Sequence, residues 1–425
     1  MGKNRLIGAI DLGSTKITTL IGQIDSDPLD SEKNINIVGA FSSPSFGIKK
    51  GQIVDIEETV EAVISSVEAS ERMAGYNLSS AFVSLGGATL KSQNSHGVVA
   101  VSGPDSEITK SDIDRAIDAA SAVSLPASRE VIHVLPTQYI VDGEPGVKDP
   151  IGMSGVRLEV DTHIVSASTS AVKNLKKAVN EVGVVIEEIV FSGLASSGSV
   201  VTSTEKELGC VLIDIGGGTT SIAAFIDGAL SYSGVIPIGA KNVTNDLAIG
   251  LRVSLETAEK IKIVLSTNKN QPAGRQVKEG EDEIPLESLG ISEIKKVSKK
   301  TLLEGIIRPR LNEIFTMVKL ELDKEGIGNR IPSGAIVTGG GALTAGVIDS
   351  AKRMLSLPVR IGTPGGISGL IDDILTPAFA TPIGLLIHGA YSEPKERLTS
   401  IGKKLKLPKL GIFGKIIDNI RDLLP

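Results

Sequence analysis

Tryptophan is absent from this chain of 425 residues, and aromatic residues make up only 3% of it. Proteins that bind single-stranded nucleic acid stack bases on aromatic side chains, so this scarcity argues against such a role. The formal net charge of −6 argues against general binding to the phosphate backbone, which requires an excess of Lys and Arg. We therefore expect no nucleic-acid partner.

Cysteine is almost absent too, since Cys210 is the only one, and no internal disulfide can form. Its place in an apolar run predicts a small core residue, and a chain without disulfides suits a reducing cytoplasm. The N-terminus runs from MGKNR directly into a predicted strand, without the apolar segment of a secretion signal. No apolar run is long enough to span a bilayer. These absences favour a cytoplasmic globular protein.

The most informative stretch is residues 210–227, CVLIDIGGGTTSIAAFID. Two apolar runs predict a buried β-hairpin around a glycine-rich turn. Three glycines and two threonines exceed what a tight turn needs, and they suit a backbone that approaches a ligand closely. The amides of such a turn can bind an anion, and an aspartate at the strand end can hold Mg²⁺ through water. The residues concerned are Asp214, Gly216, Gly217, Gly218 and Thr219.

The same order of residues occurs near the N-terminus, in IGAIDLGSTKITTLIG. Asp11 corresponds to Asp214, and Gly13 to Gly216. The remaining turn residues are Ser14, Thr15 and Lys16. A single glycine-rich turn is equally typical of an ordinary tight turn, but its repetition favours two related lobes. We predict that each lobe offers one phosphate-binding hairpin and that a nucleotide polyphosphate lies between them.

This pair of hairpins resembles the phosphate loops of the actin-like ATPase superfamily, which includes actin, sugar kinases and heat-shock chaperones. The resemblance implies an α/β, two-lobed fold with ATP as the ligand and with Mg²⁺ held through water by Asp11 and Asp214. It also implies an adenosine loop. The segment AIVTGGGALTAG is similar to that loop and would bring Gly339, Gly340 and Gly341 close to the base.

A further segment, AEKIK, resembles the helix that holds the ribose and adenine in this superfamily. Glu259 and Lys262 would be the contacting residues. They are three positions apart and share one helix face, so an exposed salt bridge is the alternative interpretation.

The predicted elements divide the chain into two lobes with inserts. Residues 83–162 change to short β-runs with one helix that Thr109 can cap, which predicts a small α+β subdomain suited to protein contacts. Helices are expected from Ile56 to about Ala74 and from Leu302 to about Lys324, the second kinked by Pro309. The first lobe is assigned to residues 1–82, 163–192 and about 363–392, the second to 193–239 and 306–362, and a second insert to 240–305.

The last 17 residues, 409–425, form an amphipathic pattern after a charged linker at 393–408. This segment is too short to span a bilayer but suits a helix that lies in the membrane interface, and nearby lysines favour anionic lipid. A helix that binds a partner or packs on its own protein is the alternative. The proposed membrane-facing residues are Leu410, Phe413, Ile416, Ile417, Ile420, Leu423 and Leu424.

From residue 5 to the end, the chain resembles the FtsA family of bacterial cell-division proteins. The similar stretches include IGAIDLGSTK, HVLPTQYIVDG, PIGMSGVRLE, VLIDIGGGTT and PVRIGTPGGISGL. In that family 83–162 would be subdomain 1C and 240–305 subdomain 2B. The resemblance implies an adaptor that polymerises head to tail on the inner membrane at the division septum, anchors FtsZ filaments through 2B and recruits later division proteins through 1C.

Catalytic residues are not evident. Actin relatives often place a water-orienting Gln or acid after the first-lobe strand, but VSASTSAV, at 165–172, has neither. We expect slow or incidental ATP hydrolysis, with ATP joining the lobes. A pilus-assembly relative of the same fold is the nearest alternative, and the amphipathic tail distinguishes the two.

Overall fold

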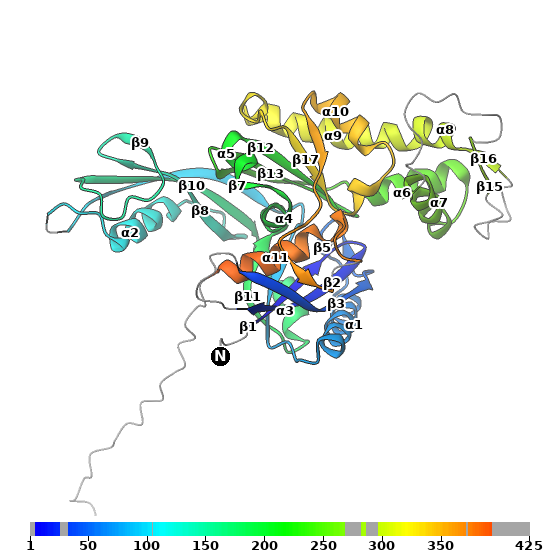
Figure 1. The fold of residues 1–425 in the computed structure, drawn as a ribbon, viewed down its shortest axis with the longest axis horizontal. Helices are drawn as coiled ribbons and strands as arrows, with labels where there is room; N and C mark the ends of the chain where they lie inside the picture. Colours follow the sequence, from blue (N-terminus) through cyan, green and yellow to red (C-terminus); the bar gives the residue numbers. More distant parts are fainter. Residues whose placement is uncertain are drawn as a thin grey trace, which may run out of the picture. The chain divides into compact units, whose positions relative to one another are not determined.

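The structure is a computed structural model and describes residues 5–25, 33–103, 105–267, 282–285, 296–370 and 373–392. The predicted linker and the predicted membrane helix lie outside the described residues. The described residues are organised around a six-stranded sheet and a five-stranded sheet (Figure 1). No helix within the described residues is both long and apolar enough to cross a bilayer.

The first lobe is built on a six-stranded sheet with the order β11-β6-β1-β2-β3-β19. Because strand side chains alternate between faces, Ile7 and Ala9 of β1 enter one core layer and Ile10 enters the other. Helices α1 and α3 cover the Ile10 face, and α11 covers the other. The strands are β1 (Arg5–Leu12), β2 (Lys16–Asp25), β3 (Asn34–Pro44), β6 (Ser80–Leu85), β11 (Val185–Phe191) and β19 (Ser368–Gly369), and the helices are α1 (Ile56–Ala74), α3 (Thr169–Asn180) and α11 (Ala380–Tyr391).

The second lobe repeats this plan with a five-stranded sheet, β14-β13-β12-β17-β18. Its two faces pack against α9 and α10 and against α4, and α4 and α11 lie together between the two sheets (Figure 1). The predicted hairpin is confirmed, because β12 and β13 pair antiparallel up to Ile215 and Thr220. The strands are β12 (Cys210–Ile215), β13 (Thr220–Ile226), β14 (Ala229–Ile236), β17 (Ala335–Thr338) and β18 (Val359–Ile361), and the helices are α4 (Ser192–Val200), α5 (Ser203–Leu208), α9 (Arg308–Lys324) and α10 (Val347–Leu355).

The first insert is a four-stranded sheet, β7-β10-β8-β9, covered by α2. The predicted cap of α2 is present, since the Thr109 amide and hydroxyl both donate to Asp112 Oδ2 (2.9 and 2.6 Å). The insert was predicted at residues 83–162; in the structure β6 joins the six-stranded sheet, and β10 continues to Ser168. Alternation identifies a strand but not the sheet that it joins. The elements are β7 (Lys91–Ala100), α2 (Lys110–Ser121), β8 (Arg129–Val141), β9 (Glu144–Val147) and β10 (Arg157–Ser168).

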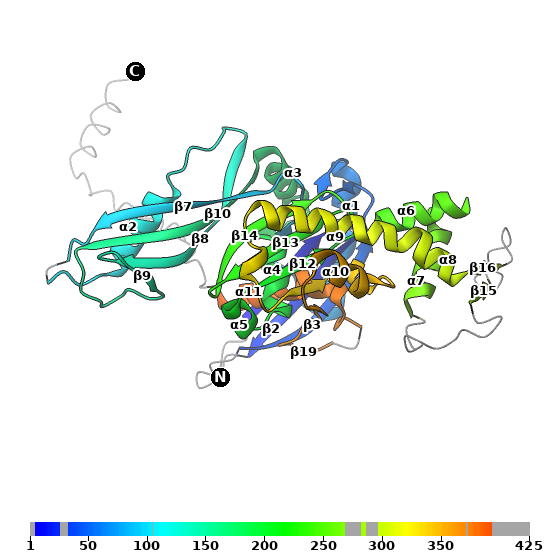
Figure 2. The same ribbon diagram turned by 90° about the horizontal axis from the view of Figure 1, so that it is seen from above.

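This insert also contacts the second lobe, where β7 and β10 meet β14 (Figure 2). The Ser92 hydroxyl donates to the Ser233 carbonyl (2.7 Å) and accepts from the Ser233 amide (3.2 Å). His163 Nε2 lies 2.9 Å from the Ser233 hydroxyl, and its Nδ1 lies 2.7 Å from Asn94 Oδ1. Burial lowers the pKa of His163 to about 4, so the ring is neutral at neutral pH. The insert is therefore covalently part of the first lobe and hydrogen-bonded to the second.

The second insert contains α6 (Ala240–Leu251), α7 (Leu255–Thr267), β15 (Glu283–Pro285), β16 (Lys296–Ser298) and α8 (Lys299–Leu302). A π-helical segment, Leu303–Ile307, joins α8 to α9. Pro309 lies in the first turn of α9 and has no backbone N–H group to donate. It lies where the hydrogen-bond pattern changes from π-helical to α-helical. The structure thus places a change of helix type just before Pro309, and the kink itself stays a prediction.

Candidate functional site

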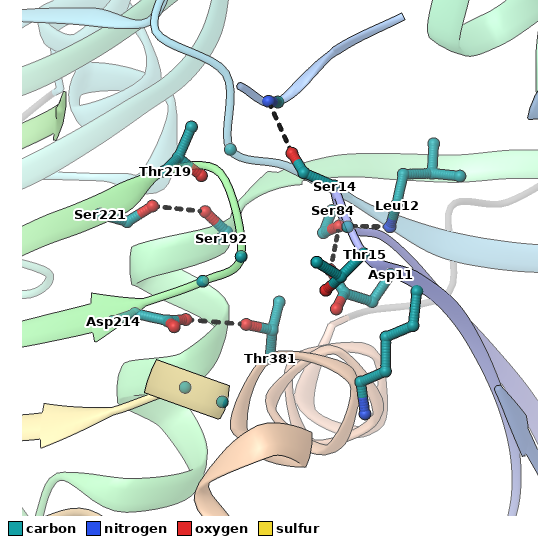
Figure 3. A pocket seen from close by; sticks show the side chains of 18 of the residues that line it. Asp11, Leu12, Ser14, Thr15, Ser84, Ser192, Asp214, Thr219, Ser221 and Thr381 are labelled. Carbon is teal, nitrogen blue, oxygen red and sulfur yellow. Dashed lines mark hydrogen bonds between the residues drawn. The ribbon is translucent and has the colours of Figure 1, made fainter. Parts of the chain in front are cut away.

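A cavity lies where the two predicted hairpins meet, and side chains from both lobes line it (Figure 3). Of the sequence-predicted site residues, the lining includes Asp11, Gly13, Ser14, Thr15, Lys16, Asp214, Gly216, Gly217, Thr219, Gly339 and Gly340. Residues not anticipated from sequence complete it: Leu12, Gly51, Ser84, Gly86, Ser192, Ser221, Pro377, Ala378 and Thr381.

In the first hairpin, Asp11 comes near the end of β1 and is fixed by a neighbouring strand. The Ser84 hydroxyl donates to Asp11 Oδ1 (2.6 Å) and accepts from the Leu12 amide (3.0 Å). Burial raises the pKa of Asp11, and the Ser84 hydrogen bond and the charge of Lys16 oppose this shift. Lys16 Nζ lies 3.6 Å from the centre of the Phe379 ring, a cation–π contact. The site thus holds a half-buried carboxyl group, Asp11, near a half-buried ammonium group, Lys16.

In the second hairpin, Asp214 is the last residue but one of β12 and accepts a hydrogen bond from Thr381 (2.9 Å), in the first turn of α11 (Figure 3). Burial, together with the charge of Asp11, raises the pKa of Asp214 to about 6, and the hydrogen bond from Thr381 opposes this shift. The amides of Ala240 and Lys241, at the start of α6, donate to the carbonyls of Gly216 and Gly217 (2.9 and 2.8 Å). These carbonyls therefore point toward residues outside the cavity lining, which leaves the opposite side of the turn for a ligand.

The two hairpins touch each other through glycine. A Cβ atom on Gly217 would lie 2.4 Å from Thr15 Cγ2, and one on Gly218 would lie 2.8 Å from the Ser14 hydroxyl oxygen. A side chain at either position would therefore force a shift of the opposite hairpin. Gly217 and Gly218 thus allow the two lobes to approach each other closely at this point.

The predicted adenosine loop follows β17. Gly339 has a φ of +82°, and a Cβ atom there would lie 2.2 Å from Asp214 Oδ1. A Cβ atom on Gly341 would lie 2.3 Å from Ile215 Cγ2. Gly339 and Gly340 line the cavity, whereas Gly341 and Gly218 do not and serve close packing instead.

Glu259 and Lys262 do not belong to the cavity lining. Lys262 Nζ donates to Glu259 Oε2 (2.7 Å) and to the Thr244 hydroxyl (2.9 Å), and Lys262 is buried. Both residues lie on helix α7. This helix contacts the predicted adenosine loop after β17, which we call the third loop, because the Ala345 amide donates to the Ser266 hydroxyl (3.1 Å). Their role toward a nucleoside stays a prediction: the Lys262 side chain is only 11% exposed, but the Glu259 side chain is 45% exposed.

Some of the unanticipated lining residues carry hydroxyl groups. The hydroxyl oxygens of Ser192, at the start of α4, and Ser221, in β13, are 3.0 Å apart. Ser84 lies near the end of the buried strand β6, and Thr381 lies in the first turn of α11, after a 3-10 turn at Pro377–Phe379. In the sequence, only the position of these residues near the ends of a strand or a helix indicates that they could line a site.

The carboxylates of the cavity are the candidate ligands for a metal ion. Within the part of the chain that the structure describes, no group of three or more His, Cys, Asp or Glu side chains is arranged to hold a metal ion. Asp11 and Asp214 alone supply too few ligands for a cage. They do suit an octahedral cation that keeps waters and takes its remaining ligands from phosphates.

The fold places the chain among actin-like proteins. A chain of the PilM–PilN type IV pilus biogenesis complex matches with a TM-score of 0.63 at 14% identity, over 91% of this chain and 99% of that one. MreB5 of Spiroplasma citri bound to ADP matches with a TM-score of 0.51 at 15% identity, over 91% and 96%. At these identities the likeness concerns the fold alone. The predicted actin-like α/β fold is confirmed.

Sequence comparisons specify the family. The model of the SHS2 domain inserted in FtsA matches residues 87–166, and the model of cell division protein FtsA matches residues 211–384. The FtsA of Pseudomonas aeruginosa is 39% identical over 92% of this chain and 90% of its own length, and that of Escherichia coli K12 is 33% identical over 95% and 96%. The chain belongs to the FtsA family of cell division proteins.

Proposed function

We propose that this protein is an ATP-binding, self-polymerising adaptor that anchors FtsZ filaments to the cytoplasmic face of the inner membrane at the division septum. One observation carries the nucleotide part: an Asp–Gly hairpin from each lobe faces the same cavity. The phosphates would contact Ser14, Thr15, Lys16 and residues 216–219. The base would lie near the third loop, between Gly340 and α7.

Mg²⁺ would be held through waters by Asp11 and Asp214. Burial raises the pKa of both carboxyl groups, and the charge of Asp11 adds to the shift of Asp214, so a divalent cation would favour the ionised form of both. ATP would join the lobes, because the residues that contact it come from both. None of the residues in 165–172 lines the cavity, which supports slow or incidental hydrolysis.

The adaptor role is assigned to parts of the chain outside this cavity. The SHS2-like insert would be subdomain 1C and would meet later division proteins, and the insert that begins with α6 would be subdomain 2B and would meet FtsZ. Membrane binding is assigned to the helix predicted at 409–425. This division leaves the core free to respond to nucleotide while the inserts and the tail carry the contacts.

A co-pelleting assay tests this function directly. With ATP and anionic liposomes, the full chain should bring FtsZ filaments into the liposome pellet. A chain truncated after residue 408 should bind ATP equally but leave FtsZ in the supernatant. If the truncated chain delivers FtsZ to liposomes as well as the full chain does, the anchoring role is incorrect.

Filament formation gives a separate prediction. Head-to-tail contact between one insert and the other end of the next copy generates an open, heterologous filament. Lys91 and Ser166 are paired neighbours, so residues 92–165 can be removed and the ends joined across a short gap. We expect this deletion to abolish filaments seen by electron microscopy and to leave ATP affinity within about threefold. Normal filaments from the deleted chain would contradict the head-to-tail model.

A further inference from the structure

A short hairpin, β4 (Ile48–Lys49) and β5 (Gln52–Ile53), has an unusual residue at its tip. Both turn residues have positive φ, 51° for Lys50 and 69° for Gly51. A two-residue turn of this kind favours Asn followed by Gly, because a longer side chain is strained in the left-handed region. Lys50 is exposed, so packing does not explain its presence. Backbone strain of this kind is often kept for a function of the side chain.

The tip lies against the phosphate loops of both lobes. The Gly51 amide donates to the Ser14 hydroxyl (2.9 Å), and a Cβ atom on Gly51 would lie 2.5 Å from the Gly86 carbonyl oxygen. On the side of the second lobe, a Cβ atom on Gly218 would lie 3.1 Å from the Lys50 amide nitrogen. Gly51, Gly86 and Ser14 line the cavity. Lys50 therefore stands at its rim.

This rim is the end where the terminal phosphate would lie. Figure 3 shows Ser14 on the far side of the cavity from Asp214 and Thr381. The third loop, which would hold the base, is beside Asp214, since Gly339 approaches that carboxylate too closely for a side chain. A nucleotide whose base is at the third loop thus extends its phosphates toward the hairpin tip.

The charge of the cavity lining calls for another cation at this end. Its charged residues are Asp11, Asp214 and Lys16, and Lys16 Nζ is engaged with the Phe379 ring. A triphosphate adds several negative charges, and together with the two carboxylates these exceed the positive charge of Lys16 and the proposed Mg²⁺. Lys241 is also exposed near the second loop, but its amide binds the Gly217 carbonyl on the side away from the cavity lining. Lys50 immediately precedes Gly51, whose amide donates to the Ser14 hydroxyl, so its backbone lies on the Ser14 side of the cavity.

We propose that Lys50 binds the terminal phosphate of a nucleoside triphosphate and makes the site prefer triphosphate over diphosphate. This inference rests on the proposed nucleotide binding. It adds a residue that distinguishes a triphosphate from a diphosphate. The hairpin tip then connects the presence of that phosphate to loops of both lobes.

Isothermal titration calorimetry of the full chain with ATP and with ADP, both with Mg²⁺, tests the proposal. Lys50→Asn removes the charge and keeps a residue that tolerates the left-handed region. We expect it to weaken ATP binding about tenfold and to change ADP binding less than twofold, because a charge-assisted contact is lost only with ATP. Lys50→Arg should restore most of the ATP affinity. Lys49→Asn, the same charge change one residue earlier, is the matched control and should leave both affinities unchanged.

The outcomes separate this proposal from nucleotide binding itself. If the unaltered chain binds neither nucleotide, the proposed function is wrong. If it binds ATP and Lys50→Asn has no effect, Lys50 does not contact the terminal phosphate. If Lys50→Asn weakens ATP and ADP equally, the turn supports the loops structurally and the proposal is also overturned.

Discussion

Gly217→Val should reduce ATP affinity by about 100-fold or more, measured by isothermal titration calorimetry. The first carbon of the new side chain would already lie 2.4 Å from Thr15 Cγ2, on the opposite lobe. Overpacking of this kind costs about 1–3 kcal/mol, and moving the lobes apart would in addition separate the groups that contact phosphate. About 2.7 kcal/mol corresponds to a 100-fold loss.

Two further variants show whether the contact between the lobes is the cause. Gly365→Val is the matched control, because a Cβ atom there would have no heavy atom within 4 Å, and we expect normal ATP affinity. Gly217→Ala should weaken binding less than valine does. Adding Thr15→Ser to it removes the methyl group that the new Cβ meets, so part of the loss should be recovered. Unchanged ATP affinity in Gly217→Val would remove this turn from the phosphate site.

The parts of the site that sequence could predict are those encoded within one hairpin. Asp11 and Asp214 each follow a buried run and precede a glycine-rich turn, and both line the cavity. Local signals also fixed the helix Ile56–Ala74, whose bounds agree with the prediction, and the Thr109 cap.

What sequence could not predict depends on neighbours distant in the chain. Ser84 reaches Asp11 only because β6 lies parallel to β1, and Thr381 reaches Asp214 only because α11 returns between the lobes. For the same reason, the sequence pattern of β6 identifies a strand but not the sheet to which it belongs. Gly51 joined the site through a turn whose short strands, Ile48–Lys49 and Gln52–Ile53, are too brief to show a period.

Phe413→Asp combined with Ile417→Asp should release the protein from anionic liposomes in a pelleting assay, with ATP affinity unchanged. In the sequence these residues fall on the apolar face of the predicted helix, which carries seven large apolar residues. Burying each contributes on the order of 1–2 kcal/mol, and ordering the helix offsets part of the total. Losing two anchors and placing two charges in the apolar face should therefore remove most of the modest net affinity.

A control variant with the same change of charge on the polar face shows whether the apolar face is the anchor. Lys415→Ala with Asn419→Asp also makes the helix more negative by two charges, but it keeps all seven apolar residues. Each basic residue near an anionic surface contributes about 1 kcal/mol, so this variant should bind more weakly yet still pellet as filaments. Filaments amplify the difference, because one polymer carries many tails and binding becomes multivalent. We thus expect the Lys415/Asn419 pair to recover on liposomes when ATP induces filaments, and the Phe413/Ile417 pair not to recover. Full pelleting of the Phe413/Ile417 variant would instead assign the helix to a protein partner.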